Sequence, residues 1–217
     1  MMNVIFIAPP AAGKGTISEY LVETNGYIHL STGELLRKVA SENTELGRHI
    51  AKLMQEGILV EEGIVLKVFE SELERIKDKA FILDGIPRKA HQAEYLDNLF
   101  KQFGIQKYVV INLDIDENLL TKRITGRRVC SNCGASYNIN DDAFRPKMID
   151  SCDICNSKLI QRKDDNEETF KVRYQTYLKE TKPLLDYYRE KGVLHKIDAS
   201  KSQQEIRAAV EEIVKGG

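Results

Sequence analysis

Four cysteines in two Cys-x-x-Cys pairs are the residues of this chain whose types and spacing indicate chemistry most directly. Cys130 and Cys133 form the first pair, and Cys152 and Cys155 follow after a gap of 18 residues. Four thiolates at this spacing suit a tetrahedral Zn²⁺ ion and leave no open position for catalysis, so we expect a structural zinc site. Iron is an alternative, because sites made of four thiolates also accept it.

Each cysteine pair is followed by a residue that tolerates a left-handed backbone, as a tight metal-binding turn requires. Gly134 follows the first pair and Asn156 follows the second. The segment 127–165 is polar with little apolar periodicity, so we expect that it needs the metal in order to fold. A zinc ribbon that binds nucleic acid is the rival interpretation, against which stand several acidic residues of this segment: Asp141, Asp142, Asp150 and Asp153.

A loop at 8–16 with the sequence APPAAGKGT is the second chemical signal. It follows a short apolar run and opens a stretch with helical spacing, which is the context that a phosphate-binding loop requires. Backbone N–H groups at the start of such a helix form a concavity that favours an anion. Lys14 can then reach the β- and γ-phosphates of a nucleotide, and the Thr16 hydroxyl is placed near the metal and the phosphates.

Ala8 and Ala11 occupy positions of this loop where glycine is expected. Alanine keeps the N–H group, but it resists a positive φ and adds a methyl group close to the ligand. If either residue adopts a left-handed conformation, a strain of about 1–2 kcal/mol follows. We therefore expect a strained alanine here to weaken nucleotide binding.

Short apolar runs alternate with longer amphipathic stretches along most of the chain. The runs predict strands at 3–7, 27–30, 80–83, 108–113 and 193–197. Helical spacing marks the stretches at 41–55, 64–77, 91–103, 168–189 and 203–214. Buried strands that alternate with helices favour an α/β fold with a parallel sheet covered on both faces.

The composition excludes several classes of protein. The chain has 217 residues and a formal net charge of -1, so it lacks the basic excess typical of a protein that grips DNA or RNA. It contains no run of about 18 or more apolar residues, and Met1-Met2-Asn3 leads directly into an apolar strand instead of a secretory signal. We therefore expect a cytoplasmic protein without a nucleic-acid or membrane partner.

Further motifs follow the loop in a fixed order. They are STGELLR at 31–37, LDGIPR at 83–88 with Gln92 after it, RITGR at 123–127 and QRKDD at 161–165. Together with the loop and the cysteine pairs, this ordered set resembles the adenylate kinase family, in the bacterial long form with a zinc-binding lid. The resemblance extends over nearly the whole chain, and it implies a reversible phosphoryl transfer from Mg·ATP to AMP that yields two ADP.

The resemblance also implies which residues bind AMP. Arg37 and Arg88 correspond to the arginines of the AMP phosphate, and planar guanidinium groups suit bidentate phosphate binding. Thr32 and Gln92 correspond to residues that hold the adenine. The other expected substrate-binding residues are Ile58, Leu59 and Val60, through their backbone, and Gly85, Ile86 and Pro87.

For ATP, the resemblance implies the loop residues Ala11, Ala12, Gly13, Lys14, Gly15 and Thr16. The arginines expected to close over the transferring phosphoryl group and ATP are Arg123, Arg127, Arg162 and Arg173. Asp164 and Asp165 resemble the acidic pair that orients these arginines. Ser136, Tyr137 and the backbone near Lys201 correspond to contacts with the sugar and base.

Catalysis of phosphoryl transfer consists of positioning and charge stabilisation, because there is little covalent work for a protein to do. Asp84 ends a predicted strand, where its carboxylate can hold Mg²⁺ through the water shell of the ion. The expected catalytic residues are Lys14, Asp84, Arg88, Arg127, Arg162 and Arg173. The histidines match no role in the family; they are His29, His49, His91 and His195.

The fold implied by the resemblance is a P-loop NTPase-type parallel five-stranded sheet flanked by helices, with two insertions. We expect a rigid core at 1–30, 61–126 and 166–217. The insertions, an AMP-binding helical segment at 31–60 and a zinc-binding lid at 127–165, are expected to be mobile. The family implies a monomer whose partners are ATP, AMP and ADP.

Two other functions remain open from the sequence. The same scaffold can carry a kinase for UMP, CMP or GMP, since base choice depends on the shape of the pocket, although Thr32 and Gln92 favour adenine. A non-catalytic nucleotide-binding protein is the rival of a different class, and Ala8 and Ala11 are the only indication of it. No charged catalytic residue is missing, which favours an enzyme.

Overall fold

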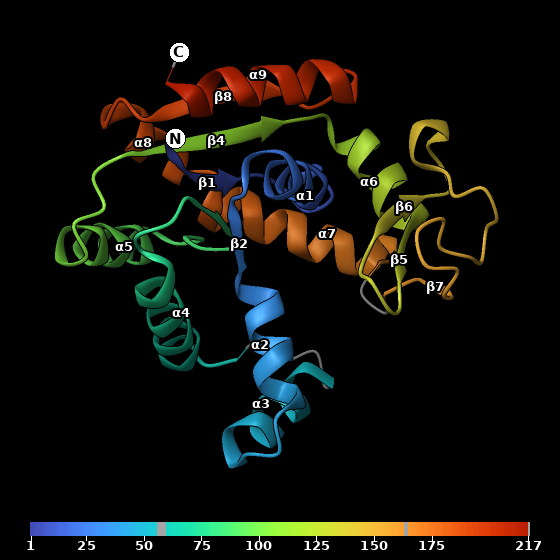
Figure 1. Ribbon diagram of the computed structural model, residues 1–217, viewed down its shortest axis with the longest axis horizontal. Coiled ribbons are helices and arrows are strands. Elements are labelled where there is room, and N and C mark those ends of the chain that lie inside the picture. Colours follow the sequence, from blue (N-terminus) through green and yellow to red (C-terminus); the bar gives the residue numbers. More distant parts are fainter. Residues whose placement is uncertain (56–59, 163–164, 217) are drawn as a thin grey trace.

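The computed structural model describes residues 1–55, 60–162 and 165–216, and its centre is a five-stranded parallel sheet (Figure 1). The strand order is β2-β3-β1-β4-β8. These strands are β1 (Asn3–Ile7), β2 (Ile28–Ser31), β3 (Phe81–Asp84), β4 (Tyr108–Asp114) and β8 (Leu194–Asp198). Each lies within one residue of a strand predicted from an apolar run, so the expected fold class is confirmed.

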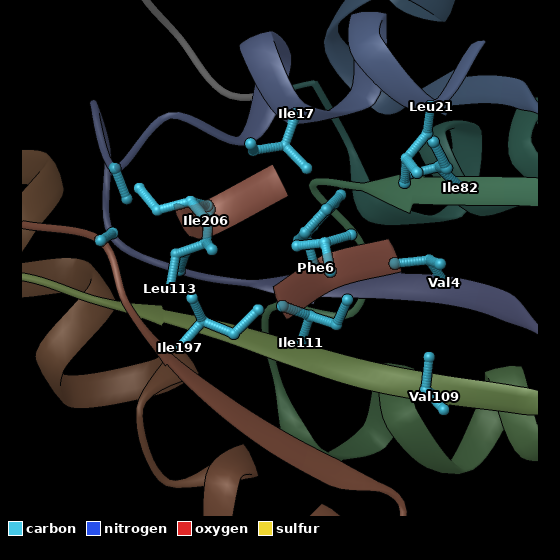
Figure 2. Close-up of a cluster of buried hydrophobic side chains, with 14 of the residues drawn as sticks. Val4, Phe6, Ile17, Leu21, Ile82, Val109, Ile111, Leu113, Ile197 and Ile206 are labelled. Atoms are coloured by element: carbon cyan, nitrogen blue, oxygen red, sulfur yellow. The ribbon is translucent and has the colours of Figure 1, made fainter. Parts of the chain in front are cut away.

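Helices cover both faces of the sheet, and alternate residues of each strand face opposite sides. Val4 and Phe6 belong to one buried cluster with residues of α1 (Lys14–Asn25), α6 (Glu117–Gly126) and α9 (Gln203–Lys215). Figure 2 shows part of this cluster, with residues of α1 and α9 beside the strands. Ile5 and Ile7 belong to a second cluster with residues of α4 (Glu62–Ile76), α5 (Ala90–Gln102) and α8 (Leu184–Glu190). In the described part of the chain, none of the helices has the length and apolar character needed to span a membrane.

The stretch predicted as helical at 168–189 is interrupted in the structure. It consists of α7 (Glu167–Thr176), a π-helical turn η2 (Tyr177–Thr181) and then α8. The backbone N–H of Lys182 donates to the carbonyl of Tyr177 at 2.8 Å, five residues back. Pro183 has no N–H with which to continue an α-helical pattern, which explains the irregular turn.

Two helices follow β2 and extend away from the sheet at the bottom of Figure 1. They are α2 (Thr32–Ser41) and α3 (Glu45–Gln55), and they pack against each other. The helix predicted at 41–55 therefore begins only at Glu45, and a separate helix precedes it.

The cysteine segment forms its own small antiparallel sheet, at the right of Figure 1. Its strands are β5 (Arg127–Cys130), β6 (Ser136–Asn138) and β7 (Leu159–Ile160), in the order β6-β5-β7, and a short 3₁₀ turn η1 (Asp142–Phe144) follows β6. Gly134 and Asn156 have φ angles of 79° and 58°, so the predicted left-handed turn after each cysteine pair is confirmed.

Side-chain amides hold the cysteine segment against the end of α6. Asn138 Nδ2 donates to the carbonyl of Arg123 at 2.9 Å, and Asn140 Nδ2 donates to that of Lys122 at 3.0 Å. Gly126 permits this close approach, because a Cβ atom there would overlap Asn138 Oδ1. The carbonyl of Arg123, one of the last four that a helix end leaves unpaired, thus receives a partner, and the Lys122 bond adds a second attachment.

Candidate active site

A cavity of about 640 Å³ lies at the carboxyl end of β1, where the chain turns into α1. In parallel sheets of this kind, ligands bind beyond the carboxyl ends of the strands. Many of the predicted site residues line this cavity: Ala11, Ala12, Gly13, Lys14, Gly15, Thr16, Thr32, Arg37, Asp84, Gly85, Arg88, Arg123, Arg127, Ser136, Tyr137, Arg162 and Arg173. Residues far apart in the sequence therefore meet in one place.

Other predicted residues lie elsewhere. Lys201 lines a separate groove between β8 and α9, and Ile86 is buried in the core at 1% exposure. Of the described residues that were predicted to bind nucleotide or to orient the arginines, those that do not line the cavity are Val60, Ile86, Pro87, Gln92, Asp165 and Lys201. Ile58, Leu59 and Asp164 fall outside the described residues.

The loop between β1 and α1 contains one left-handed alanine, the case considered above for Ala8 and Ala11. Ala11 has a φ of 64° and Gly13 a φ of 101°, whereas Ala8 is not among the described residues with a positive φ. Strain of the kind considered for both alanines therefore applies to Ala11 alone. Lys14 folds back over the loop, and its Nζ donates to the carbonyls of Ala8 and Pro9 at 3.4 and 3.5 Å.

Like charges around the cavity act on Lys14. Burial lowers the pKa of Lys14, and three arginines of the lining lower it further, namely Arg88, Arg173 and Arg127. Asp84 opposes this effect, with its Oδ1 at 3.8 Å from Lys14 Nζ. Burial by itself would raise the pKa of Asp84, but Lys14 and His29 hold it below its usual range. The cavity thus combines an ionised carboxylate with an excess of cations, which suits a ligand with several negative charges.

His29 is a cavity residue that the sequence did not identify. Its Nε2 lies 3.8 Å from Asp84 Oδ2 and is buried without a hydrogen-bond partner among the described residues. One signal in the sequence could have identified it. His29 lies two residues before the end of β2, which corresponds to the strand predicted at 27–30, and this strand pairs with β3, whose last residue is Asp84. Glu19 also lines the cavity, where burial raises its pKa, and no motif marked it.

Arg127 is held at the border of the cysteine segment by a two-point ion pair. Its Nε donates to Asp165 Oδ2 at 2.8 Å, and its Nη2 contacts Asp165 Oδ1. Asp165 is 1% exposed, and its carbonyl accepts a hydrogen bond from Gln161 Nε2 at 2.7 Å. Because β5 begins at Arg127 and the chain leaves the segment near Asp165, this pair joins both borders of the segment.

Gly85 allows the expected AMP residues to approach one another. It has a φ of 91°, and a Cβ atom on it would lie 2.5 Å from Thr32 Oγ1 and 3.1 Å from Arg88 Nη2. Arg88 Nε donates to the Gly85 carbonyl at 2.9 Å. Thr181 of η2 donates through its hydroxyl to the Arg88 carbonyl at 3.1 Å.

Gln92 is engaged within the protein at both ends of its amide group. Its Oε1 accepts from the Arg88 backbone N–H at 2.8 Å, and its Nε2 donates to Glu62, whose carboxylate also contacts His91. An N–H group only donates and a carboxylate only accepts, so these partners determine which way the amide faces. Only the second N–H of Nε2 and the second lone pair of Oε1 are then available for the contact with adenine that was expected for Gln92.

The four cysteine sulfurs gather as a metal site requires. All four Sγ atoms lie within 4.8 Å of one another, and the pairs Cys130–Cys155 and Cys133–Cys152 are 3.4 and 3.6 Å apart. A tetrahedral zinc ion with bonds of about 2.3 Å needs sulfurs about 3.8 Å apart, so the cluster fits it. Hydrogen bonds with Ser157 lower the pKa of Cys155 to about 5, whereas desolvation and hydrogen bonds with the other sulfurs raise the pKa of Cys133 to about 12. In the metal-free cluster one thiol therefore ionises readily while its neighbour keeps its proton.

A lysine loop and arginines from several elements around one cavity define the class of nucleoside monophosphate kinases, which bring two phosphate-bearing nucleotides together. Residues 6–193 match the family model described as adenylate kinase. Adenylate kinases of Archaeoglobus fulgidus and Clostridioides difficile are both 41% identical, over 98% of this chain and 98% and 97% of their own. That of Caldanaerobacter subterraneus subsp. tengcongensis is 43% identical over 94% of this chain and 92% of its own. The chain belongs to the adenylate kinase family.

Replacing Ala11 with glycine should stabilise the protein. The change relieves about 1–2 kcal/mol of left-handed strain in the folded protein. It also gives the unfolded chain more conformational freedom, which destabilises the folded protein by about 0.4–1 kcal/mol and offsets part of that gain. We expect the free energy of unfolding to rise by up to about 1.5 kcal/mol in urea titrations followed by circular dichroism. Affinity for ATP should rise as well, as judged by calorimetry.

Ala8→Gly is the matched control, because Ala8 is buried and has no positive φ to relieve. It should lower the free energy of unfolding. A shift of both variants in the same direction would contradict the assignment of strain to Ala11.

Breaking the Arg127–Asp165 pair should be costly. Asp165→Asn keeps the shape of the side chain but leaves a partly buried guanidinium without its counter-charge, which costs about 3–5 kcal/mol when such a pair is broken. Thermal unfolding measures the loss. Asp186→Asn is the control, because its pair with Arg189 is exposed and should contribute little. Equal losses in the two variants would show that burial of the first pair has no energetic effect.

Proposed function

We propose that the chain catalyses reversible, Mg²⁺-dependent transfer of the γ-phosphoryl group of ATP to AMP, which yields two ADP. The observation that carries this proposal is the convergence of basic side chains on one cavity beside the loop. Among the described residues, seven line it: Lys14, Arg37, Arg88, Arg123, Arg127, Arg162 and Arg173. Such a set neutralises the charge of two nucleotides and of the transferring group.

On the donor side, the loop residues bind the phosphates of ATP through their backbone N–H groups, and Lys14 contacts the β- and γ-phosphates. Asp84 and the Thr16 hydroxyl hold Mg²⁺ and its water shell; the ion, when bound, neutralises charge on the β- and γ-oxygens. The position of Asp84, 3.8 Å from Lys14 at the end of β3, supports this role. Ser136 and Tyr137, which line the cavity, contact the sugar and base. The backbone near Lys201, expected to join them, lines a separate groove and receives no support from the cavity.

On the acceptor side, Arg37 and Arg88 bind the phosphate of AMP, while Thr32 and Gln92 hold the adenine. The closeness of Thr32 and Arg88 across Gly85 supports a shared site. Backbone groups at 58–60 complete it, of which only Val60 is among the described residues. Relatives named adenylate kinase support AMP over UMP, CMP or GMP as the acceptor.

The arginines at the borders of segment 127–165 form a clamp, and the segment acts as a lid that closes over ATP and expels water. The phosphoryl group then passes to AMP and not to solvent. The core at 1–30, 61–126 and 166–217 stays rigid, while the lid and the AMP-binding segment at 31–60 move. The ion pair of Arg127 with Asp165 at the lid border supports this arrangement.

Zinc has a structural role in the proposed lid. The lid has a buried cluster of only three residues among those described, Cys130, Cys152 and Leu159. So small a core contributes little, and four thiolate bonds to one ion stabilise the fold in its place. A monomer acting on free nucleotides needs no nucleic-acid or membrane partner.

The reaction is tested by ADP production from Mg·ATP with AMP, CMP, UMP and GMP in parallel. We expect rapid turnover with AMP alone, and a loss of at least about a hundredfold in Lys14→Met. ATP hydrolysis without AMP should be much slower than transfer. No turnover with any acceptor while ATP still binds would make this a binding protein, and hydrolysis as fast as transfer would refute the water-excluding lid.

Removal of zinc should unfold the lid before the core. We expect calorimetry of the chelator-treated protein to show a separate transition at lower temperature, and readdition of Zn²⁺ to abolish it. Elemental analysis of the purified protein identifies the metal and decides between zinc and iron. A single cooperative transition, unshifted by a strong chelator, would count against a structural metal.

A further inference from the structure

Tyr137 contacts both the cysteine cluster and the cavity. It lies in β6 and is one of the residues that line the cavity, and its side chain packs against the buried cluster of Cys130, Cys152 and Leu159. Its hydroxyl oxygen is 3.3 Å from Cys152 Sγ. One residue therefore borders both the proposed metal site and the proposed nucleotide site.

The direction of the hydrogen bond to sulfur follows from the other partner of the hydroxyl. The backbone N–H of Asp153 donates to the Tyr137 hydroxyl oxygen at 2.9 Å. That oxygen thus accepts from the backbone, and its own hydrogen is left to donate to Cys152. A thiolate bound to a metal ion has no hydrogen and can only accept, so the geometry suits the metal-bound form of Cys152.

We propose that Tyr137 is a positioning residue that couples metal binding in the lid to binding of the donor nucleotide. Its hydroxyl donates to the metal-bound thiolate of Cys152, which fixes the ring in the wall of the cavity. Partners of this kind around a metal ligand change metal affinity by about 10–100-fold. The inference rests on the proposed zinc site and on the proposed contact of Tyr137 with ATP.

Coupling between two binding sites is reciprocal. If the metal fixes the ring for ATP, then ATP bound against the ring must retain the metal more strongly. AMP binds among other residues, on the side of Thr32 and Arg88, and should have a much smaller effect. The Tyr137→Phe variant keeps the ring but loses the hydroxyl, so it should lose the coupling while ATP can still contact the ring.

The test uses the full-length, zinc-loaded protein and follows release of Zn²⁺ to a chromogenic chelator. We expect release from Tyr137→Phe to be about 10–100-fold faster than from the unmodified protein. Saturating ATP should slow release from the unmodified protein but not from the variant. In steady-state assays, the variant should show a raised KM for ATP and an unchanged KM for AMP.

Tyr187→Phe is the matched control. Its hydroxyl also bonds a side chain, that of Asp97, but it lies on α8 away from both sites. It should release Zn²⁺ at the unmodified rate. Equal release from Tyr137→Phe and the unmodified protein would overturn the proposal, as would release that ATP does not slow. If Tyr137→Phe fails to fold, the effect of ATP against that of AMP on the unmodified protein still decides the coupling.

Failure of the coupling and failure of the proposed metal site are distinguishable. A purified protein that holds no zinc and takes up none would refute the metal site, and the coupling with it. A protein that holds zinc, releases it equally with and without the Tyr137 hydroxyl, and still transfers phosphoryl groups to AMP would refute the coupling alone.

Discussion

Repulsion between basic side chains held close together is the constraint on which the rest of this structure depends. Lys14 begins α1, Arg88 follows β3, Arg127 begins β5 and Arg173 lies in α7. Burial and this repulsion lower the pKa of Lys14, so the elements that carry these cations must be held in place by other forces. The parallel sheet, buried on both faces, supplies them. An anion in the cavity would relieve this repulsion, so the site favours ligands that carry several negative charges.

Two carboxylates, one in the core and one at the border of the cysteine segment, offset part of the repulsion between the basic side chains of the cavity. Asp84 lies at the end of β3 beside Lys14, within the core. Asp165 lies at the border of the cysteine segment and pairs with Arg127. The second pair also attaches a segment that has almost no core of its own, and the amides of Asn138 and Asn140 attach it to α6. Electrostatics and attachment therefore depend on the same few contacts.

Local sequence predicted much of this architecture. The five strands were recognisable because both faces of the sheet are buried, which makes each strand a continuous apolar run. The left-handed turns at Gly134 and Asn156 followed from their residue types, and of the two loop alanines it is Ala11 that adopts the left-handed conformation. Pro183 was a local signal that the helix predicted at 168–189 would be interrupted, but the π-helical form of η2 follows only from the hydrogen bond of Lys182 to Tyr177.

The sequence by itself determined the fold class, the four cysteines that cluster and the identity of the cavity cations, because each depends on residue type and short-range spacing. Only the tertiary structure decided how those residues meet. It brought His29 to Asp84, engaged both ends of the Gln92 amide, and left Lys201 in a separate groove. It also joined Tyr137 to Cys152. These contacts link residues on different elements, and their distances are set by how helices pack on the sheet, which no local pattern records.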